Sequence, residues 1–120
     1  MKIIDVNKLK PVQFHGGNSY RSVLKNDNLG FALMKTVINK GGPYLWHYKN
    51  HQEACYCVSG KGKLQDITTG EIYDIKPGIT YLVDNNQPHN FTALTEVVLI
   101  SVFNPPLRGD ETHDKFGNYI

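Results

Sequence analysis

Two segments of the chain contain residue types that proteins use to bind metal ions. The first, residues 41–60, begins and ends with glycine and carries Glu53. The second, residues 77–89, begins with a proline-glycine pair and ends with His89. Strand residues two apart point to the same face, so side chains from neighbouring strands can converge inside a small barrel. Since carboxylate and imidazole groups are common metal ligands, Glu53 and His89 are candidate metal ligands if their strands adjoin.

The elements that would position these side chains are short β-strands. Turn-forming clusters of glycine, proline, asparagine and aspartate recur along the chain, and short apolar or alternating runs lie between them. These runs are residues 31–38, 54–58, 62–67, 71–75, 80–83, 90–92 and 97–103. Only residues 5–9 and the stretch after Asp110 suit short helical turns. This spacing predicts an all-β fold, a sandwich or closed barrel, with residues 1–120 forming a single domain.

Composition excludes several other classes of protein. The 120 residues are 40% hydrophobic and 20% charged, which is typical of a globular domain rather than a disordered chain. The net charge is +2 and the lysines are scattered among acids, so no basic stripe indicates a nucleic-acid partner. No apolar run approaches the ~20 residues of a membrane span, and the N-terminus has no signal-peptide pattern. We therefore expect a cytoplasmic protein with no nucleic-acid or membrane partner.

The two segments resemble the conserved motifs of the cupin superfamily. This resemblance implies a small cupin barrel, also described as a double-stranded β-helix or jelly roll. The usual first motif has a second histidine where this chain has Lys49, a poor metal ligand. Glu53 and His89 therefore need another donor, and Tyr81, in the strand before His89, is the candidate. Nitrogen, carboxylate and phenolate donors suit Fe²⁺, although Zn²⁺, manganese or nickel is also compatible.

Other potential ligands have plainer interpretations. Cys55 and Cys57 share the face of Glu53, and two cysteines at this spacing in one strand are badly placed to bond to each other. We interpret them as reduced thiols in the core rather than as zinc ligands. His47 is interpreted as structural or as an outer neighbour of the ligands, and His15 as a solvated surface residue.

Several blocks of sequence, in order, narrow the resemblance to one family within the cupins. The blocks are residues 27–31, 47–57, 75–84, 102–107 with Gly109, and 111–114. Together they are similar to the signature of ectoine synthases, and the similarity runs from about Gly17 to Tyr119. Several blocks in family order are far more specific than the cupin motifs alone.

The resemblance implies an activity and a set of site residues. Ectoine synthases are cytoplasmic cupins, usually homodimers, with a catalytic iron. They close N-γ-acetyl-L-2,4-diaminobutyrate into ectoine, a compatible solute against osmotic stress, with loss of water. The family's iron ligands map onto Glu53, Tyr81 and His89. Its substrate contacts map onto Thr36, Tyr48, His51, Phe103, Glu111 and His113, and Arg21 is a further candidate.

The chemistry suits these residue types. A metal-dependent hydro-lyase of this kind must drive an amine onto a weakly electrophilic amide carbonyl, and a Lewis acid would polarise that carbonyl. A base must take the amine proton and an acid must help water to leave. Tyr48, His51 and Glu111 are the candidate catalytic groups, without an order among them.

Three departures from the family pattern bear on the substrate. The family has tryptophan just after Asn18, where this chain has Ser19 followed by Tyr20; Tyr20 is a candidate to stand in for it. Asparagine is replaced by Met34 and cysteine by Ser101. Because these positions border the family's substrate pocket, the chain could act on another N-acylated diamino acid. Met34 is expected in the core or the pocket wall.

Two alternatives come from other functional classes. A cupin of this size could be a metal-containing module that binds a small ligand without turnover. It could also be a lyase or dioxygenase acting on another substrate, although Lys49 argues against the common dioxygenase site. Melting-temperature shifts without product would indicate the first, and oxygen consumption the second.

Overall fold

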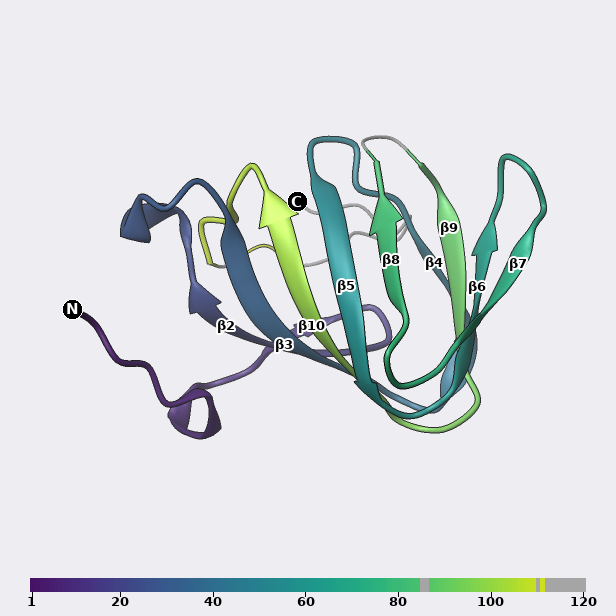
Figure 1. Ribbon diagram of the computed structural model, residues 1–120, viewed down its shortest axis with the longest axis horizontal. Helices are drawn as coiled ribbons and strands as arrows, with labels where there is room; N and C mark the ends of the chain where they lie inside the picture. Colours follow the sequence, from purple (N-terminus) through teal and green to yellow (C-terminus); the bar gives the residue numbers. More distant parts are fainter. Residues whose placement is uncertain (85–86, 110, 112–120) are drawn as a thin grey trace.

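Two antiparallel sheets wrap into a barrel in this computed structural model, which describes residues 1–84, 87–109 and 111. In Figure 1 the larger sheet crosses the left and centre and the smaller one forms the right side. The six-stranded sheet has the order β1 (Val12–Phe14), β2 (Gly17–Val23), β3 (Ala32–Ile38), β10 (Val97–Asn104), β5 (Gln52–Ser59), β8 (Thr80–Val83). The four-stranded sheet has the order β4 (Gly41–Trp46), β9 (His89–Ala93), β6 (Gly62–Asp66), β7 (Ile72–Ile75). The predicted all-β fold is confirmed.

Helical structure is limited to two single turns of 3₁₀-helix among the described residues. The first, η1 (Val6–Lys8), lies within the predicted turn at residues 5–9, and the Asp5 side chain accepts a hydrogen bond from the Asn7 N–H at its start. The second is η2 (Lys25–Asp27). The predicted helical turn after Asp110 lies outside the described residues, apart from Glu111. No helix in the described part of the chain has the length and apolar character needed to cross a membrane.

The strand predictions missed three strands for two physical reasons. β1 and β2 were overlooked because the buried positions of β2 include polar residues, Ser19 and Arg21, so its sequence does not alternate in hydrophobicity. The glycines of β4 were interpreted as a turn. They instead form an irregularity in the strand, since the register with β9 shifts between Gly41 and Tyr44 and both Gly41 and Gly42 have positive φ.

The barrel interior is built from alternating inward positions. Along β10, for example, Val97, Leu99, Ser101 and Phe103 are all nearly inaccessible. The registers of five neighbouring strands place one residue from each in a line across the sheet. This line, called the central row below, is Arg21, Met34, Ser101, Cys55 and Tyr81. All five side chains are buried, so the row is one inner wall of the barrel.

Candidate active site and metal centre

A narrow cavity between the sheets, the inner cavity, brings several predicted site residues together. Five of its lining residues were predicted as metal ligands or substrate contacts: Thr36, Tyr48, Glu53, Tyr81 and Phe103. Its other lining residues are Phe14, Ser19, Met34, Trp46, Leu99 and Ser101. The cavity therefore brings two of the predicted metal ligands, Glu53 and Tyr81, beside three of the predicted substrate contacts.

Glu53 is a buried carboxyl with unused bonding capacity. It faces inward from β5, and its Oε1 has no hydrogen-bond partner among the described residues. Burial raises its pKa to about 8, against an opposing effect of hydrogen bonding to Cys55. A buried carboxylate is costly unless a cation faces it. The side chain therefore fits a metal ligand.

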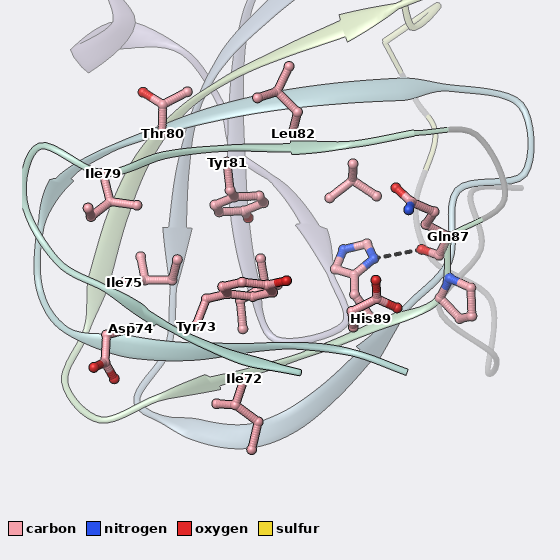
Figure 2. Close-up of a pocket in the computed structure, with 14 residues that line it drawn as sticks. Ile72, Tyr73, Asp74, Ile75, Ile79, Thr80, Tyr81, Leu82, Gln87 and His89 are labelled. Carbon is pink, nitrogen blue, oxygen red and sulfur yellow. Dashed lines mark hydrogen bonds between the residues drawn. The ribbon is translucent and has the colours of Figure 1, made fainter. Parts of the chain in front are cut away.

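His89 is oriented so that one ring nitrogen is available inside the barrel. Its Nδ1 lies 2.9 Å from the carbonyl oxygen of Gln87, drawn as a dashed line in Figure 2. If Nδ1 donates this bond from a neutral ring, Nε2 is left as an acceptor. Nε2 is buried and has no partner among the described residues. Burial lowers the pKa of His89 and so keeps the ring neutral, as metal ligation requires.

Tyr81 connects the surroundings of these two groups. It lines the inner cavity together with Glu53, and it lines a second cleft, bordered by β7 and β8, together with His89. Figure 2 shows the Tyr81 and His89 rings in this cleft. Burial is the main reason why the pKa of Tyr81 is well above its ordinary value, followed by the influence of Cys55 and Glu53. A cation would reverse these effects and favour the phenolate.

The donor set is unusual in composition. Among the described residues, no three histidine, cysteine, aspartate or glutamate side chains form a group that could hold a metal. The predicted set contains two residues of those types, Glu53 and His89, and needs Tyr81 as its third member. Carboxylate, imidazole and phenolate donors fit iron or zinc chemically.

A chain of aromatic contacts connects His89 to the predicted substrate contacts. The Tyr48 ring lies edge-on to His89, with centroids 5.6 Å apart, and edge-on to Phe103 at 5.4 Å. The His51 ring in turn lies 5.9 Å from Phe103. His51 Nδ1 is 2.8 Å from the carbonyl oxygen of Pro105, which holds the ring against the segment after β10. The structure thus brings His51 beside the cavity wall, although it does not line the inner cavity itself.

Arg21 and Glu111 fasten the segment after β10 to β2. Arg21 Nη1 donates to the carbonyl oxygen of Gly109 at 3.0 Å and lies 3.8 Å from Glu111 Oε1. The Glu111 carboxylate accepts hydrogen bonds from the main-chain N–H groups of Arg108 and Gly109, both at 2.8 Å. Burial raises the pKa of Glu111, but these hydrogen bonds outweigh it and the net pKa is lowered. The predicted contact His113 lies outside the described residues.

The three departures from the family pattern all lie on the wall of the inner cavity. Ser19 Oγ is 3.2 Å from Met34 Sδ and accepts a bond from Arg21 Nε at 3.1 Å. Tyr20 belongs to the alternate face of β2 and lies under the ammonium of Lys35, 5.4 Å from the ring centre. The interpretation of Tyr20 as a replacement for the tryptophan is therefore wrong, because Ser19 holds the inward position.

Some lining residues were missed by the sequence analysis. Trp46 is 3% exposed, stacks on Phe91 at 5.6 Å and donates from Nε1 to the carbonyl oxygen of His15 at 2.7 Å. The spacing of Tyr44, Trp46 and Tyr48 was the signal that could have found it, since residues two apart share a face. The two cysteines are free and buried, and His15 is exposed, as predicted.

Comparison with known proteins agrees with this geometry. The family model described as ectoine synthase matches residues 2–120. The chain belongs to the ectoine synthase family. Within the family it is 46% identical to the L-ectoine synthase of Oceanobacillus iheyensis over 101 residues, covering 84% of this chain and 79% of the relative. It is 43% identical to the L-ectoine synthase of Desulfosudis oleivorans over 111 residues, covering 92% and 86%.

Solved structures support the same assignment. The crystal structure of ectoine synthase from P. lautus superposes with a TM-score of 0.85 at 36% identity, covering 91% of this chain and 81% of that one. An RmlC-like cupin from Shewanella frigidimarina matches with a TM-score of 0.67 at 20% identity, covering 82% and 86%. The second match concerns the fold alone, and together they confirm the predicted cupin barrel.

Proposed function

We propose that this member of the ectoine synthase family converts N-γ-acetyl-L-2,4-diaminobutyrate into ectoine and water. The observation that carries the proposal is the inner cavity, where Glu53 and Tyr81 meet Thr36, Tyr48 and Phe103. The unused Glu53 Oε1 and His89 Nε2 atoms support a metal-dependent mechanism.

The reaction forms one carbon–nitrogen bond and breaks one carbon–oxygen bond. The substrate's α-amine attacks the carbonyl carbon of its own acetamide group and closes a six-membered ring. One amine proton goes to the carbonyl oxygen. That oxygen then leaves as water with a second proton from a ring nitrogen, and a carbon–nitrogen double bond remains. The protein must hold a flexible chain in a ring-closing conformation and move two protons.

Glu53, Tyr81 and His89 would hold the metal, with Fe²⁺ as the proposed ion and Zn²⁺ or another divalent metal as alternatives. When bound, the ion supplies Lewis acidity toward the acetamide oxygen. The burial of all three ligands keeps water away and strengthens every electrostatic interaction at the site.

The remaining residues bind the substrate and transfer protons. Arg21 is a buried guanidinium suited to the substrate carboxylate, and Thr36 can hydrogen-bond a polar group of the substrate. Phe103 forms an apolar wall, and His113 is retained as a proposed contact. Tyr48, His51 and Glu111 are the proposed catalytic acids and bases. Of these, Tyr48 is the one that lines the inner cavity.

A proton NMR time course tests this proposal. Protein loaded with Fe²⁺ under anaerobic conditions is mixed with N-γ-acetyl-L-2,4-diaminobutyrate, and ectoine signals are expected to appear and to stop on chelation. The Glu53→Gln variant should form ectoine more than about 100-fold more slowly, whereas Glu96→Gln, which changes an exposed glutamate, should behave as wild type. Absence of ectoine from a folded, metal-loaded sample would contradict the proposal. The substrate would then be sought among other N-acylated diamino acids.

The chain is also proposed to be a cytoplasmic homodimer. The outer face of the six-stranded sheet carries exposed apolar side chains on adjoining strands: Tyr56 and Val58 of β5, Leu82 of β8 and Ile100 of β10. Such a patch is typical of a protein interface. Sedimentation equilibrium should give a dimer for the wild type and a monomer for Leu82→Glu. A monomeric wild type would contradict this part of the proposal.

A further inference from the structure

The Cys55 thiol lies beside both of the proposed ligands that belong to the six-stranded sheet. It is 1% exposed, and the strand register places it between Ser101 of β10 and Tyr81 of β8. Glu53 precedes it by two residues on β5 and faces the same side. Cys55 is not among the residues that line the inner cavity. Its thiol therefore lies beside the ligands but outside the inner cavity.

A short chain of hydrogen bonds connects this thiol to the substrate side of the cavity. Cys55 Sγ lies 3.2 Å from Ser101 Oγ, and Ser101 Oγ lies 2.9 Å from Thr36 Oγ1. Both Thr36 and Ser101 line the inner cavity. A thiol is a weak donor and a weak acceptor, so it can accept a bond from the Ser101 hydroxyl while donating toward a carboxylate.

Cys57 offers an internal comparison. It is as buried as Cys55 and faces the same side of β5, but its Sγ lies 3.5 and 4.0 Å from the carbonyl oxygens of Ser59 and Gly60. These two carbonyl groups belong to the last residue of β5 and to the turn that follows it. The two thiols therefore differ in what they touch, not in burial.

We propose that Cys55 is a positioning residue, whose thiol holds Glu53 and Tyr81 in the orientation that binds the metal and is itself held by Ser101. The inference rests on the proposed ligand set of Glu53, Tyr81 and His89. Groups just behind metal ligands commonly fix ligand orientation in this way. Direct ligation by Cys55 is disfavoured, because Cys55, Glu53 and His89 do not form a three-residue group that could hold a metal.

Cobalt(II) titration of the whole protein tests the inference, with absorption spectra recorded at each addition. Cys55→Ala should weaken cobalt binding about 10- to 100-fold and change the absorption bands of the bound ion. Cys55→Ser replaces the thiol with a hydroxyl, which can also donate a hydrogen bond, so it should bind cobalt more tightly than Cys55→Ala. Cys57→Ala removes the same volume two residues away, so it is the matched control and should bind cobalt as the wild type does.

Two results would overturn the inference. One is equal cobalt affinity in folded Cys55→Ala and Cys57→Ala. The other is a thiolate-to-cobalt charge-transfer band that disappears in Cys55→Ala, because Cys55 would then be a ligand itself. Should Cys55→Ala fail to fold, Ser101→Ala keeps the thiol but releases it, and unchanged cobalt affinity there would count equally against the inference. An error in the proposed ligand set would give a different result. If Glu53 is not a ligand, Glu53→Gln should bind cobalt as tightly as the wild type.

Discussion

The two sheets of the barrel contribute unequally to the site. The buried polar or charged side chains of the described residues are Ser19, Arg21, Glu53, Ser101, His89 and Glu111. The first four belong to the six-stranded sheet, His89 is the one from the four-stranded sheet, and Glu111 follows β10. The four-stranded sheet presents an aromatic stack instead, in which Trp46 lies against Tyr44 and Phe91.

This difference indicates that the larger sheet carries most of the proposed functional groups, whereas the smaller sheet mainly stabilises the barrel. On the larger sheet, Ser19 accepts a hydrogen bond from Arg21, and Ser101 is hydrogen-bonded to Thr36 and Cys55, so these groups constrain one another's positions. The four-stranded sheet contributes one proposed ligand, His89, whose ring contacts Trp46 of β4 at 6.0 Å and Tyr48, just after β4, at 5.6 Å. Damage to the smaller sheet at positions other than His89 should therefore appear in stability, and damage to the polar groups of the larger sheet in binding and turnover.

The largest expected effect is on stability, from Phe91→Ala. Phe91 is fully buried and stacks on Trp46, so its truncation should lower the free energy of unfolding by about 3–5 kcal/mol. Urea denaturation measures this change. Phe91→Leu keeps most of the volume and should cost less, and Thr92→Ala, next to it and half-buried, is the control. If Phe91→Ala cost no more than Thr92→Ala, the supporting role of the smaller sheet would be refuted.

A second prediction concerns Glu53→Gln in the larger sheet. Loss of the carboxylate should reduce kcat/KM more than about 100-fold and weaken metal binding correspondingly. The same change should not destabilise the metal-free protein at pH 9, because it removes a buried negative charge that no metal ion then neutralises. Steady-state kinetics and thermal melting of the chelated protein check the two halves. If Glu53→Gln destabilised the metal-free protein but left the kinetics normal, the proposed role of the larger sheet in binding and turnover would be wrong.

The third prediction is a pH dependence that differs between the ligands of the two sheets. In the metal-free protein Tyr81 is protonated throughout the neutral range, and Glu53 is protonated below its pKa of about 8. His89 is neutral because burial lowers its pKa. Metal binding must therefore displace protons from the six-stranded sheet only, and affinity should rise with pH.

The slope of that rise is measurable. The logarithm of metal affinity plotted against pH should lose about one unit of slope as pH increases through 8, where Glu53 no longer carries a proton to be displaced. Titration calorimetry in buffers of different ionisation enthalpy counts the protons released. In Glu53→Gln the change of slope near pH 8 should vanish, and its persistence would assign the proton to another group.

The smallest expected effect concerns the contact between Glu111 and the larger sheet. Glu111→Gln should lower the free energy of unfolding at pH 7 by about 1 kcal/mol, because charged bonds from two main-chain N–H groups are weakened. The folded-state pKa of Glu111 is depressed, so its contribution is present above the ordinary carboxyl pKa and lost as pH falls through the lowered value. Urea denaturation should show that the difference in free energy of unfolding between Glu111→Gln and the wild type becomes smaller under acid conditions than at pH 7. The same difference at both pH values would contradict this prediction.

The sequence predicted strands whose inner positions are mainly apolar, and it missed β2, whose inner positions include polar residues, and β4, which begins with two glycines. β10 was recognisable because Val97, Leu99 and Phe103 alternate with its outer positions, whereas β2 hides Ser19 and Arg21 inside. A strand with polar residues on both faces gives no periodic signal, whatever its environment.

Within the site, the lining role of several predicted residues followed from the family pattern, but their contacts did not. The error at Tyr20 shows why, since a displacement of one position along a strand moves a side chain to the opposite face. The bonds of Ser101 to Thr36 and Cys55 join residues 36, 55 and 101 of the chain. Such contacts between distant positions depend on the register of the paired strands, which cannot be predicted from a single sequence.

The contact between Ser19 and Met34 has a consequence for how this chain can have diverged. Because the Ser19 hydroxyl lies against the Met34 sulfur, each of these two departures forms part of the surroundings of the other. Tryptophan at position 19 alone would press a large ring against the Met34 side chain in a closed space. Asparagine at position 34 alone would place an amide where the Ser19 hydroxyl now meets a sulfur atom. The two positions are therefore expected to be epistatic, so that a substitution at one of them changes the effect of a substitution at the other.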